Sequence, residues 1–303
     1  MSKKVRFIYN PTAGNGHAAK VFETLRPYLD HVSDAHIEVF ETVRPGHATE
    51  LAREVAEEND MTVVSLGGDG THHEVVNGLM PSGKAILGII PAGTGNDFVR
   101  ALAYPRDPQD ILNVVLNGST QWFDLGLIDQ QYFLTVAGIG FDAEVAGWVN
   151  KRKKEGNGTW VFIRGILYNL LGYRSQKITV TTESFQRTED TFMISFGNTA
   201  YYAGGMNICP GASPCDGQFN VVWVKRIAPW SAIPLLTAVF HGHHVLNPHV
   251  ETLTAQDLTI DGPPQLWVHA DGELLGHLPI HVRTIPHAIR VRVGAQFQPT
   301  LPL

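Results

Sequence analysis

Short apolar runs alternate with helix-like segments over the first ~120 residues of the chain. Four of these runs, VRFIYN, HIEVFET, TVVSL and AILGIIP, have the length and the residue types of buried strands. Helices are predicted at residues 17–29, 47–58, 73–80, 97–103 and 108–117. This alternation predicts an α/β domain whose parallel sheet carries helices on both faces.

From about Asp124 onward, turn residues separate short strand-like runs. These runs are YFLTVAGIGF, KITVTTES, DTFMISFGN, QFNVVWV, DLTIDG, QLWVHADGE and AIRVRVG. They predict a mostly antiparallel β-sandwich, with helical interruptions at residues 159–173 and 229–244. We expect an α/β domain at residues 1–125 and a β-rich domain at residues 126–290. Residues from about 290 to 303 are a candidate segment for returning to the α/β domain. No Pro/Gly linker separates the two, so we expect close packing with the active site between them.

Composition narrows the class of protein. The 303 residues carry a net charge of −6, which is not the balance of a nucleic-acid-binding protein, so no nucleic-acid partner is expected. Two cysteines, Cys209 and Cys215, are too few for a disulfide framework and favour a reducing, cytoplasmic location. We expect no signal peptide, because MSKKVRFIYN runs into a strand pattern without an apolar h-region. We expect no membrane span, because the most apolar stretch, residues 160–173, is short and contains Arg164 and Asn169.

Each predicted strand of the first domain is followed by a turn: NPTAGNG, TVRPGH, GGDGT and PAGTGND. Parallel sheets bind ligands outside the carboxyl ends of their strands, so these turns should converge on one crevice. In GGDGT, Gly67 and Gly68 let backbone N–H groups approach an anion, and the following helix adds positive partial charge. Thr71 and Glu74 have capping-box spacing, which predicts that Thr71 caps this helix.

Carboxylates in two of these turns indicate a metal ion. Asp69 alone would repel phosphate, but its presence is explained if it holds Mg²⁺ that bridges the phosphates. PAGTGND offers Gly93 and Gly95 for close backbone approach, the Thr94 hydroxyl, and Asp97 as a second carboxylate. The pair predicts a metal-assisted nucleotide site, whereas either turn alone could be a Gly-rich turn with a solvated Asp. No Walker A sequence is present.

The β-rich half contributes further acidic residues. Asp271 and Glu273 flank Gly272, and one of them could accept the hydroxyl proton in phosphoryl transfer. The alternative is an ordinary acidic hairpin turn. Asp216 likewise lies either in a plain turn or in a metal-binding loop.

Together these motifs resemble the diacylglycerol-kinase catalytic-domain family, which includes bacterial lipid kinases and is related to sphingosine and ceramide kinases. GGDGTHHEVVNGL and PAGTGND carry the resemblance, and NPTAGNG, ETVRPGHATELA, GIGFDAEV, residues 197–222 and HADGE follow the family's order and spacing. NPTAGNG departs from the family's NPxSG at Thr12 and Ala13. The resemblance covers nearly the whole chain. It implies an NAD-kinase-like, Rossmann-like nucleotide-binding domain, a β-sandwich lipid domain, and nucleotide in the cleft between them.

The resemblance also implies ligand sets at matching positions. ATP would contact Asn10, Pro11, Thr12, Ala13, Gly14, Thr42, Gly67, Gly68, Asp69, Gly70, Thr71, His72, His73, Gly93, Thr94, Gly95 and Asn96. Asp69 and Asp97 would lie near catalytic Mg²⁺, and Glu273, beside Asp271, would be the proton acceptor. A structural Mg²⁺ loop would comprise Asp216 with the backbone of Ser213 and Gln218, and Asp124 would join its water network.

We therefore expect an ATP- and Mg²⁺-dependent lipid kinase that transfers the γ-phosphoryl group to a lipid hydroxyl. Conversion of diacylglycerol to phosphatidic acid, a step of phospholipid biosynthesis, is the first candidate reaction. An NAD kinase, which also uses GGDGT, is one alternative. A dinucleotide-binding oxidoreductase would use Gly14 and Gly16, with Glu41 as the ribose partner. The third alternative is a catalytically silent protein that binds a lipid or a nucleotide.

A basic cluster precedes the apolar residues 160–173 and consists of Lys151, Arg152, Lys153 and Lys154. Near an anionic membrane each base contributes about 1 kcal/mol, and Trp160, Phe162 and Tyr168 suit the membrane interface. Peripheral contact with an anionic membrane is one interpretation, and a solvated loop followed by a core helix is the equally weighted alternative. Edge strands of the β-rich domain could also pair, which makes a homodimer an expected alternative to the monomer.

Overall fold

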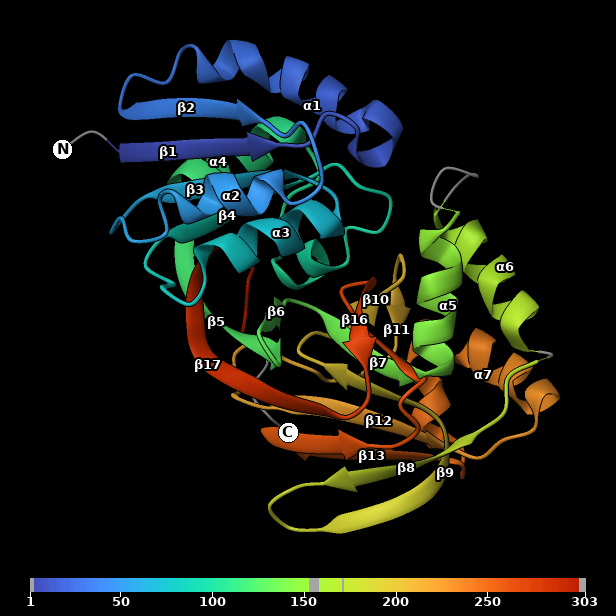
Figure 1. The fold of residues 1–303 in the computed structure, drawn as a ribbon. Helices are drawn as coiled ribbons and strands as arrows, with labels where there is room; N and C mark the ends of the chain where they lie inside the picture. The colour runs from blue at the N-terminus through green and yellow to red at the C-terminus, as the bar shows by residue number, and fades with distance from the viewer. Residues whose placement is uncertain (1–2, 153–157, 171, 300–303) are drawn as a thin grey trace. The chain divides into compact units, whose positions relative to one another are not determined.

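The computed structural model describes residues 3–152, 158–170 and 172–299. Two compact units are present: unit 1 comprises residues 3–124 and 287–299, and unit 2 comprises residues 125–286 (Figure 1). Both boundaries fall inside long strands, β5 (Ser119–Ile128) and β17 (Ile280–Val293). The expected limits of independently folding domains stay a prediction. Lys153 and Lys154 of the basic cluster lie outside the described residues.

Unit 1 is built on a parallel sheet. Its strands follow the order β17–β4–β3–β1–β2, with β1 at Lys3–Tyr9, β2 at Ala35–Glu41, β3 at Thr62–Gly67 and β4 at Ile86–Pro91. Every neighbouring pair is parallel, and Phe7 lies opposite Val39 on one side and Val64 on the other. β3 is buried along its whole length, as expected for a parallel strand covered on both faces. The predicted α/β class is confirmed.

Four helices accompany this sheet: α1 (Ala13–Leu29), α2 (His47–Arg53), α3 (Asp69–Leu79) and α4 (Pro108–Asn117). α4 begins where the sequence favours it, because the Asp107 carboxylate accepts the Gln109 N–H at 2.8 Å and Pro108 takes the first helical position. The helix predicted at residues 97–103 is only a short 3₁₀ turn, η1 (Phe98–Ala101).

The capping prediction for Thr71 is wrong. α3 begins at Asp69 because Gly68 takes the N-cap position in an extended conformation, so Thr71 lies within the first turn. Glu74 acts on the neighbouring helix instead. Its Oε1 accepts the Gly46 N–H at 3.0 Å and its Oε2 accepts the Ala48 N–H at 3.2 Å. Glu74 therefore satisfies backbone donors at the N-terminus of α2.

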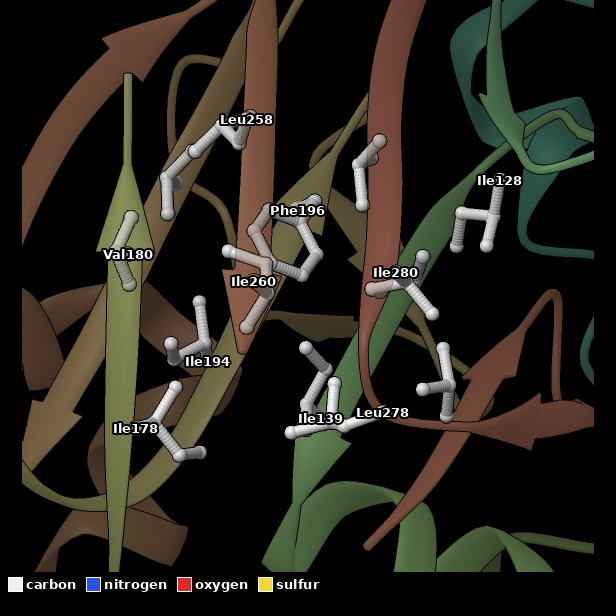
Figure 2. Close-up of a cluster of buried hydrophobic side chains, with 14 of the residues drawn as sticks. Ile128, Ile139, Ile178, Val180, Ile194, Phe196, Leu258, Ile260, Leu278 and Ile280 are labelled. Atoms are coloured by element: carbon white, nitrogen blue, oxygen red, sulfur yellow. The ribbon is translucent and has the colours of Figure 1, made fainter. Parts of the chain in front are cut away.

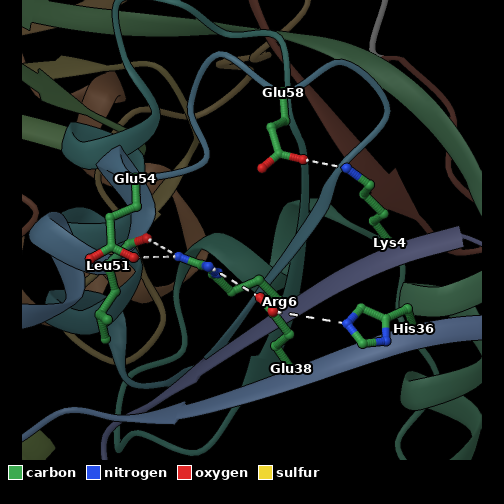
Figure 3. A network of polar contacts seen from close by, with 7 residues as sticks. All are labelled: Lys4, Arg6, His36, Glu38, Leu51, Glu54 and Glu58. Atoms are coloured by element: carbon green, nitrogen blue, oxygen red, sulfur yellow. Dashed lines mark hydrogen bonds and ion pairs between the residues drawn. The ribbon is translucent and has the colours of Figure 1, made fainter.

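A polar network around Arg6 joins β1, β2 and α2 (Figure 3). Arg6 is only 8% exposed, and its guanidinium donates to Glu38 at 3.1 Å, to Glu54 at 2.8 Å and to the Leu51 carbonyl at 3.1 Å. The guanidinium also lies 4.5 Å from the centre of the Phe40 ring. A buried cation needs such partners, so this network determines how α2 packs on the sheet.

Unit 2 has the mostly antiparallel β structure that the sequence predicts. Its pairing order is β16–β15–β7–β9–β8–β14–β17, and these pairs are antiparallel; β12 joins β9, and β13 joins β12. The strands are β6 (Gln131–Phe133), β7 (Val136–Gly140), β8 (Gln176–Thr181), β9 (Gln186–Gly197), β10 (Tyr201–Tyr202), β11 (Met206–Asn207), β12 (Phe219–Lys225), β13 (Val250–Ala255), β14 (Asp257–Asp261), β15 (Trp267–Ala270) and β16 (Glu273–His277).

Helices α5 (Phe141–Asn150), α6 (Gly158–Leu170) and α7 (Ala232–Ala238) lie together at one end of unit 2 (Figure 1). The helix predicted at residues 229–244 is broken into α7 and three short 3₁₀ turns, η2 (Pro229–Ser231), η3 (Val239–His241) and η4 (His243–Leu246). Gly242, at φ +71°, separates η3 from η4 in a left-handed conformation that glycine adopts without steric cost.

Two apolar cores lie on opposite faces of the unit 2 sheet. Along β12, Val221 and Trp223 join one core whereas Val222 and Val224 join the other, because successive side chains of a strand alternate between its faces. The first core is drawn in Figure 2 and includes Phe196 of β9 and Ile260 of β14. The second core packs α5, α6 and α7 against the sheet.

Among the described residues, no helix has both the length and the apolar character needed to cross a membrane. Cys209 and Cys215 are both free thiols. Burial raises the pKa of the Cys209 thiol well above its usual value, so this side chain stays protonated at neutral pH. It therefore behaves as a small apolar core residue.

Candidate functional site

The turns that follow β1, β3 and β4 are in direct contact. The Asn10 N–H donates to the Leu66 carbonyl at 3.0 Å, and the Ala92 N–H donates to the Gly67 carbonyl at 2.6 Å. The Asn10 side chain also lies 3.4 Å from the Thr71 hydroxyl, to which it donates. Residues from three separate turns therefore meet at the carboxyl edge of the parallel sheet, where α/β sheets bind ligands.

Asp69 joins the first glycine loop (residues 67–71) to the second glycine loop (residues 93–97). Its Oδ2 accepts the Asn96 N–H and its Oδ1 accepts the Asp97 N–H, both at 2.9 Å. Asn96 braces the second loop further, since its side chain accepts the Gly93 N–H at 2.9 Å and donates to the Gly93 carbonyl at 3.0 Å. The two loops thus form one hydrogen-bonded structure, with Asp69 at its centre.

The glycines of these loops are needed because the two backbones touch. A Cβ on Gly93 would lie 2.5 Å from the Gly68 Cα, and one on Gly68 would lie 3.1 Å from the Gly93 Cα. A Cβ on Gly95 would lie 2.8 Å from Asp69 Oδ2 and 3.1 Å from Asp97 Oδ2. Both carboxylates therefore border the same point beside Gly95, and any side chain there would fill the space between them.

These two carboxylates fit a hard divalent cation. Each oxygen of Asp69 accepts one of the two backbone N–H groups, and carboxylate oxygen is the ligand that Mg²⁺ prefers. Asp97 is buried, with Arg100 Nε 3.5 Å from its Oδ1. Within residues 3–152, 158–170 and 172–299, no three His, Cys, Asp or Glu side chains are grouped to hold a metal. Mg²⁺ bound by one or two carboxylates usually completes its shell with phosphate oxygens and water.

The predicted nucleotide contacts divide into accessible and buried residues. Gly68, Asp69 and Gly70 are partly accessible, as are Gly93, Gly95 and Asn96, and Thr94 is exposed. Thr71, His72 and His73 are buried, and His72 Nδ1 lies 2.7 Å from the Ser65 hydroxyl of β3. Side-chain contact of these three residues with a nucleotide stays a prediction.

The turn after β1 is held by its own side chains. Asn10 Oδ1 accepts the Thr12 N–H at 3.1 Å and the Thr12 hydroxyl at 2.8 Å. Gly14 has φ +59°, and a Cβ there would lie 2.2 Å from the Ala92 carbonyl oxygen. Three successive left-handed residues, Gly14, Asn15 and Gly16, precede the regular part of α1. This turn therefore packs directly against the strand end that leads into the second glycine loop.

In unit 2, Asp271 and Gly272 form the turn between β15 and β16, and Glu273 is the first residue of β16. Asp271 has φ +51° and Gly272 has φ +81°. The Asp271 carboxylate accepts three donors: the Leu134 N–H at 2.9 Å, the Thr135 N–H at 2.8 Å and the Thr135 hydroxyl at 2.6 Å. Asp271 thus holds the hairpin to the start of β7.

A buried polar cluster behind this hairpin is not assigned by the sequence argument. Asp142 Oδ2 lies 3.0 Å from His269 Nε2 and accepts the Ser195 hydroxyl at 3.2 Å, and Asp142 Oδ1 accepts the Tyr202 hydroxyl at 2.8 Å. A Cβ on Gly138 would lie 2.2 Å from Asp142 Oδ2, so glycine is required there. The visible sequence signals are GIGFD and HADGE, an Asp and a His next to apolar strands.

The residues predicted for a structural Mg²⁺ loop lie in two units. Ser213, Asp216 and Gln218 share one turn of unit 2, where Asp216 Oδ1 accepts the Gln218 N–H at 3.2 Å and Gly217 has φ +75°. Asp124 belongs to unit 1, is buried, and accepts the His287 N–H at 2.8 Å. The metal loop and its water network stay a prediction.

Comparison with known proteins accounts for nearly the whole chain. Residues 4–128 match the family model "Diacylglycerol kinase catalytic domain", and residues 135–293 match "YegS C-terminal NAD kinase beta sandwich-like domain". The chain is 31% identical over 287 residues to a diacylglycerol kinase of Bacillus subtilis (strain 168), which covers 91% of this chain and 92% of that protein. It is also 31% identical over 296 residues to one of Mycobacterium tuberculosis (strain H37Rv), which covers 95% and 94%.

Solved structures support the same fold. A diacylglycerol kinase from Bacillus anthracis str. Sterne superimposes with a TM-score of 0.74 at 22% identity, over 98% of each chain. Yeast NADH kinase complexed with NADH superimposes with a TM-score of 0.53 at 11% identity, over 97% of this chain and 84% of that chain. The predicted NAD-kinase-like architecture is thus confirmed at the level of fold. From the family matches and the 31% identity over most of its length, the chain belongs to the diacylglycerol kinase family, a family of lipid kinases.

Proposed function

We propose that this enzyme transfers the γ-phosphoryl group of ATP to the hydroxyl group of a lipid, with diacylglycerol converted to phosphatidic acid as the first candidate reaction. One observation carries the nucleotide part: Asp69 holds the two glycine loops together while its carboxylate and that of Asp97 border one point beside Gly95. Relatives of the chain are named diacylglycerol kinases, which supports a lipid as the acceptor.

In this proposal the backbone N–H groups of the partly or fully accessible residues 68–70, 94 and 95 bind and orient the phosphates. The N-terminus of α3, which begins at Asp69, adds favourable partial charge. Asp69 and Asp97 would hold Mg²⁺, which when bound neutralises phosphate charge. The lipid oxygen attacks the γ-phosphorus, the bond from that phosphorus to the β–γ bridging oxygen breaks, and ADP leaves with the electron pair.

Glu273 is our candidate for the base that accepts the lipid hydroxyl proton. The sequence leaves Asp271 and Glu273 open for this role. Asp271 already accepts three hydrogen bonds that hold the hairpin to β7, so its carboxylate is occupied by a structural role. Glu273 follows that fixed turn directly, at the start of β16 and opposite Ala270. A rigid support of this kind suits a group that must meet a reacting hydroxyl within hydrogen-bonding distance.

The test is incubation of the protein with γ-³²P-ATP, Mg²⁺ and a panel of acceptors that includes diacylglycerol, sphingoid bases and NAD. We expect label in a lipid, and loss of that label in Asp69→Ala. Asp261→Ala, which removes an exposed carboxylate of β14, is the matched control and should keep full activity. Label only in NADP would overturn the lipid assignment and establish the NAD-kinase alternative, while label in no acceptor would contradict the kinase proposal as a whole.

Peripheral contact with an anionic membrane at its cytoplasmic face is also part of the proposal. α6 exposes Trp160 at 67% and Tyr168 at 69%, which are large aromatic side chains suited to the lipid headgroup region. Lys151 is exposed just before α6, whereas the Arg152 guanidinium lies 4.2 Å from the centre of the Trp148 ring.

Charge reversal at residues 151–154 should weaken cosedimentation with phosphatidylserine vesicles and leave binding to neutral vesicles unchanged. Unaltered binding to the anionic vesicles would overturn the role of this cluster. Sedimentation equilibrium in the same preparation would decide between the monomer and the homodimer.

A further inference from the structure

Helix α5 of unit 2 lies against the hairpin that carries the candidate base. β7 pairs antiparallel with β15 and leads directly into α5, so the helix begins beside the start of β15. The ten residues of α5 span about 15 Å, and the five residues of β7 span about 13 Å between their ends. A helix of this length that folds back over the strand pair therefore reaches the turn between β15 and β16.

Two contacts fix the first part of α5 to this hairpin. Asp142, in the first turn of the helix, has its Oδ2 3.0 Å from Nε2 of His269 in β15, and both side chains are buried. Gly147 faces Leu274 of β16, where a Cβ on the glycine would lie 3.3 Å from Leu274 Cδ1. Because glycine has no such atom, the backbone of α5 packs directly on the leucine side chain. The helix is thus in contact with both strands of the hairpin.

The last residue of α5, Asn150, reaches the turn itself. Its side-chain amide donates to the Gly272 carbonyl at 2.9 Å. That carbonyl belongs to the planar peptide group that joins Gly272 to Glu273, so the bond restricts the orientation of the backbone next to the candidate base. The preceding residue, Asp271, is held from another element, because its carboxylate accepts the Thr135 N–H at 2.8 Å. The turn is therefore held at two consecutive residues.

Gly272 depends on such a contact from outside the turn. Its φ of +81° is a conformation that glycine adopts without steric cost. Among the described residues, none beyond its chain neighbours lies within 4 Å of the position that a Cβ on Gly272 would take. Steric packing therefore leaves the backbone of Gly272 free to rotate, and the hydrogen bond from Asn150 opposes that rotation.

We propose that Asn150 is a positioning residue for phosphoryl transfer, which holds the peptide group before Glu273 so that the Glu273 carboxylate keeps one direction. A general base acts only within hydrogen-bonding reach of the proton that it accepts, about 2.6–3.2 Å between heavy atoms. A misplacement of about 1 Å can lower a rate roughly 100-fold. The effect on catalysis rests on the proposed function, whereas the restraint of the hairpin by Asn150 does not.

The first test measures hydrogen–deuterium exchange by mass spectrometry on the protein without nucleotide. Asn150→Ala should speed the exchange of backbone amides in residues 271–277 roughly fivefold and leave the thermal unfolding midpoint unchanged, because Asn150 is partly exposed. Asn169→Ala is the matched control, since it removes an amide that donates to the Gly165 carbonyl within α6 at 2.7 Å. It should leave hairpin exchange as in the wild type. Equal hairpin exchange in the wild type and Asn150→Ala would overturn the restraint.

Should Asn150→Ala lower the unfolding midpoint, Asn150→Asp provides the same test. This variant keeps the shape of the side chain but has no N–H to donate to the Gly272 carbonyl. It should speed hairpin exchange roughly fivefold while exchange in the rest of unit 2 stays as in the wild type. Faster exchange throughout unit 2 in both variants would overturn a local restraint and assign Asn150 to general stability.

The second test is kinetic. Asn150→Ala should lower kcat roughly tenfold with KM for ATP unchanged, because the proposed nucleotide contacts belong to unit 1. In a Glu273→Gln background the same substitution should lower kcat less than about twofold further, since the group that Asn150 positions is then absent. Equal decreases in both backgrounds would overturn an action through Glu273, and faster hairpin exchange with unchanged kcat would overturn the positioning role. Faster exchange in Asn150→Ala, together with a wild-type protein that phosphorylates no acceptor, would support the restraint while contradicting the proposed function.

Discussion

Asp69 in unit 1 and Asp271 in unit 2 are acidic residues that tie one loop to another, yet their surroundings differ. Asp69 accepts N–H groups from Asn96 and Asp97, and the Asp97 carboxylate borders the same point beside Gly95. Asp271 accepts three donors from residues 134 and 135, and the other carboxylate of its turn, Glu273, starts a new strand. One arrangement leaves paired carboxylates suited to a cation, and the other separates a structural carboxylate from a candidate base.

The two arrangements also differ in how far apart their partners lie along the chain. Asp69 and its donors are 27 and 28 residues apart, within one strand–helix–strand repeat. Asp271 and its donors are 136 and 137 residues apart. The proposed cation site is thus built from neighbouring strand ends, whereas the position of the proposed base depends on the whole antiparallel unit having folded. Substitutions should therefore separate chemistry from stability more cleanly in the hairpin than in the glycine loops.

The largest expected difference between an effect on catalysis and an effect on stability is the one between Glu273→Gln and Asp271→Asn. Glu273→Gln removes the proposed proton acceptor and should lower kcat roughly 10²–10⁴-fold. Asp271→Asn replaces one acceptor oxygen by an NH₂ group facing a donor, which should lower the free energy of unfolding by about 2–3 kcal/mol. Single-turnover phosphorylation and urea unfolding measure the two effects. Full activity in Glu273→Gln would remove it as the base, and a stable but inactive Asp271→Asn would reverse the assignment.

Asp69 should combine both effects. Asp69→Ala removes a predicted cation ligand and leaves the Asn96 and Asp97 N–H groups without their carboxylate acceptor. We expect kcat/KM to fall roughly 10²–10³-fold, together with a loss of about 1–3 kcal/mol in unfolding free energy. Asp69→Asn keeps one acceptor oxygen and should recover part of the stability but little activity. Recovery of activity in proportion to stability would show that Asp69 acts only as a structural link.

Close contact between the glycine loops can be tested at Gly93. Gly93→Ala would place its Cβ 2.5 Å from the Gly68 Cα, so the backbones must separate, at a cost of about 1–3 kcal/mol. Gly172→Ala, with open space around the added Cβ, is the control that should change unfolding free energy little. ATP binding measured by calorimetry should weaken only in Gly93→Ala. Equal stability of the two variants would show that the loop contact is not tight.

The glycine loops and the strands before them could be predicted because local residue types determine them. Buried β-branched runs mark β3 and β4, and the glycines after them permit the turns. The capping box failed for a physical reason: Gly68 lets α3 begin earlier than Thr71, and Glu74 finds its donors at Gly46 and Ala48, on another helix.

The cluster of Asp142, Ser195, Tyr202 and His269 could not be predicted because it joins four elements that are far apart in the sequence. No local pattern specifies such a pairing. The same is true of the three-donor role of Asp271, which is why the sequence leaves two candidates for the base. Only the antiparallel register of β15 with β7 brings Asp271 to the start of β7.

The smallest effect we expect is a change in the pH dependence of stability at His244, a buried residue of η4 in unit 2. Burial lowers the pKa of His244 below its usual value near 6.5, so the unfolded chain binds this proton at a higher pH than the folded chain does. The stability due to the neutral imidazole is therefore complete above pH 6.5 and is lost as the pH falls towards the folded-state pKa. The slope cannot exceed about 1.4 kcal/mol per pH unit for one proton.

His244→Gln, which retains a donor for the Ile208 carbonyl, should reduce this loss between pH 7 and pH 5 in urea unfolding experiments. His241→Gln replaces an exposed histidine three residues earlier and should leave the pH dependence unchanged. If both variants followed the wild-type curve, His244 would have to be solvated in the folded protein, contrary to its burial in the structure. If both variants instead reduced the slope of unfolding free energy against pH by the same amount, the effect would come from the general loss of positive charge in this segment. A buried imidazole and an exposed one can behave alike only if burial does not matter.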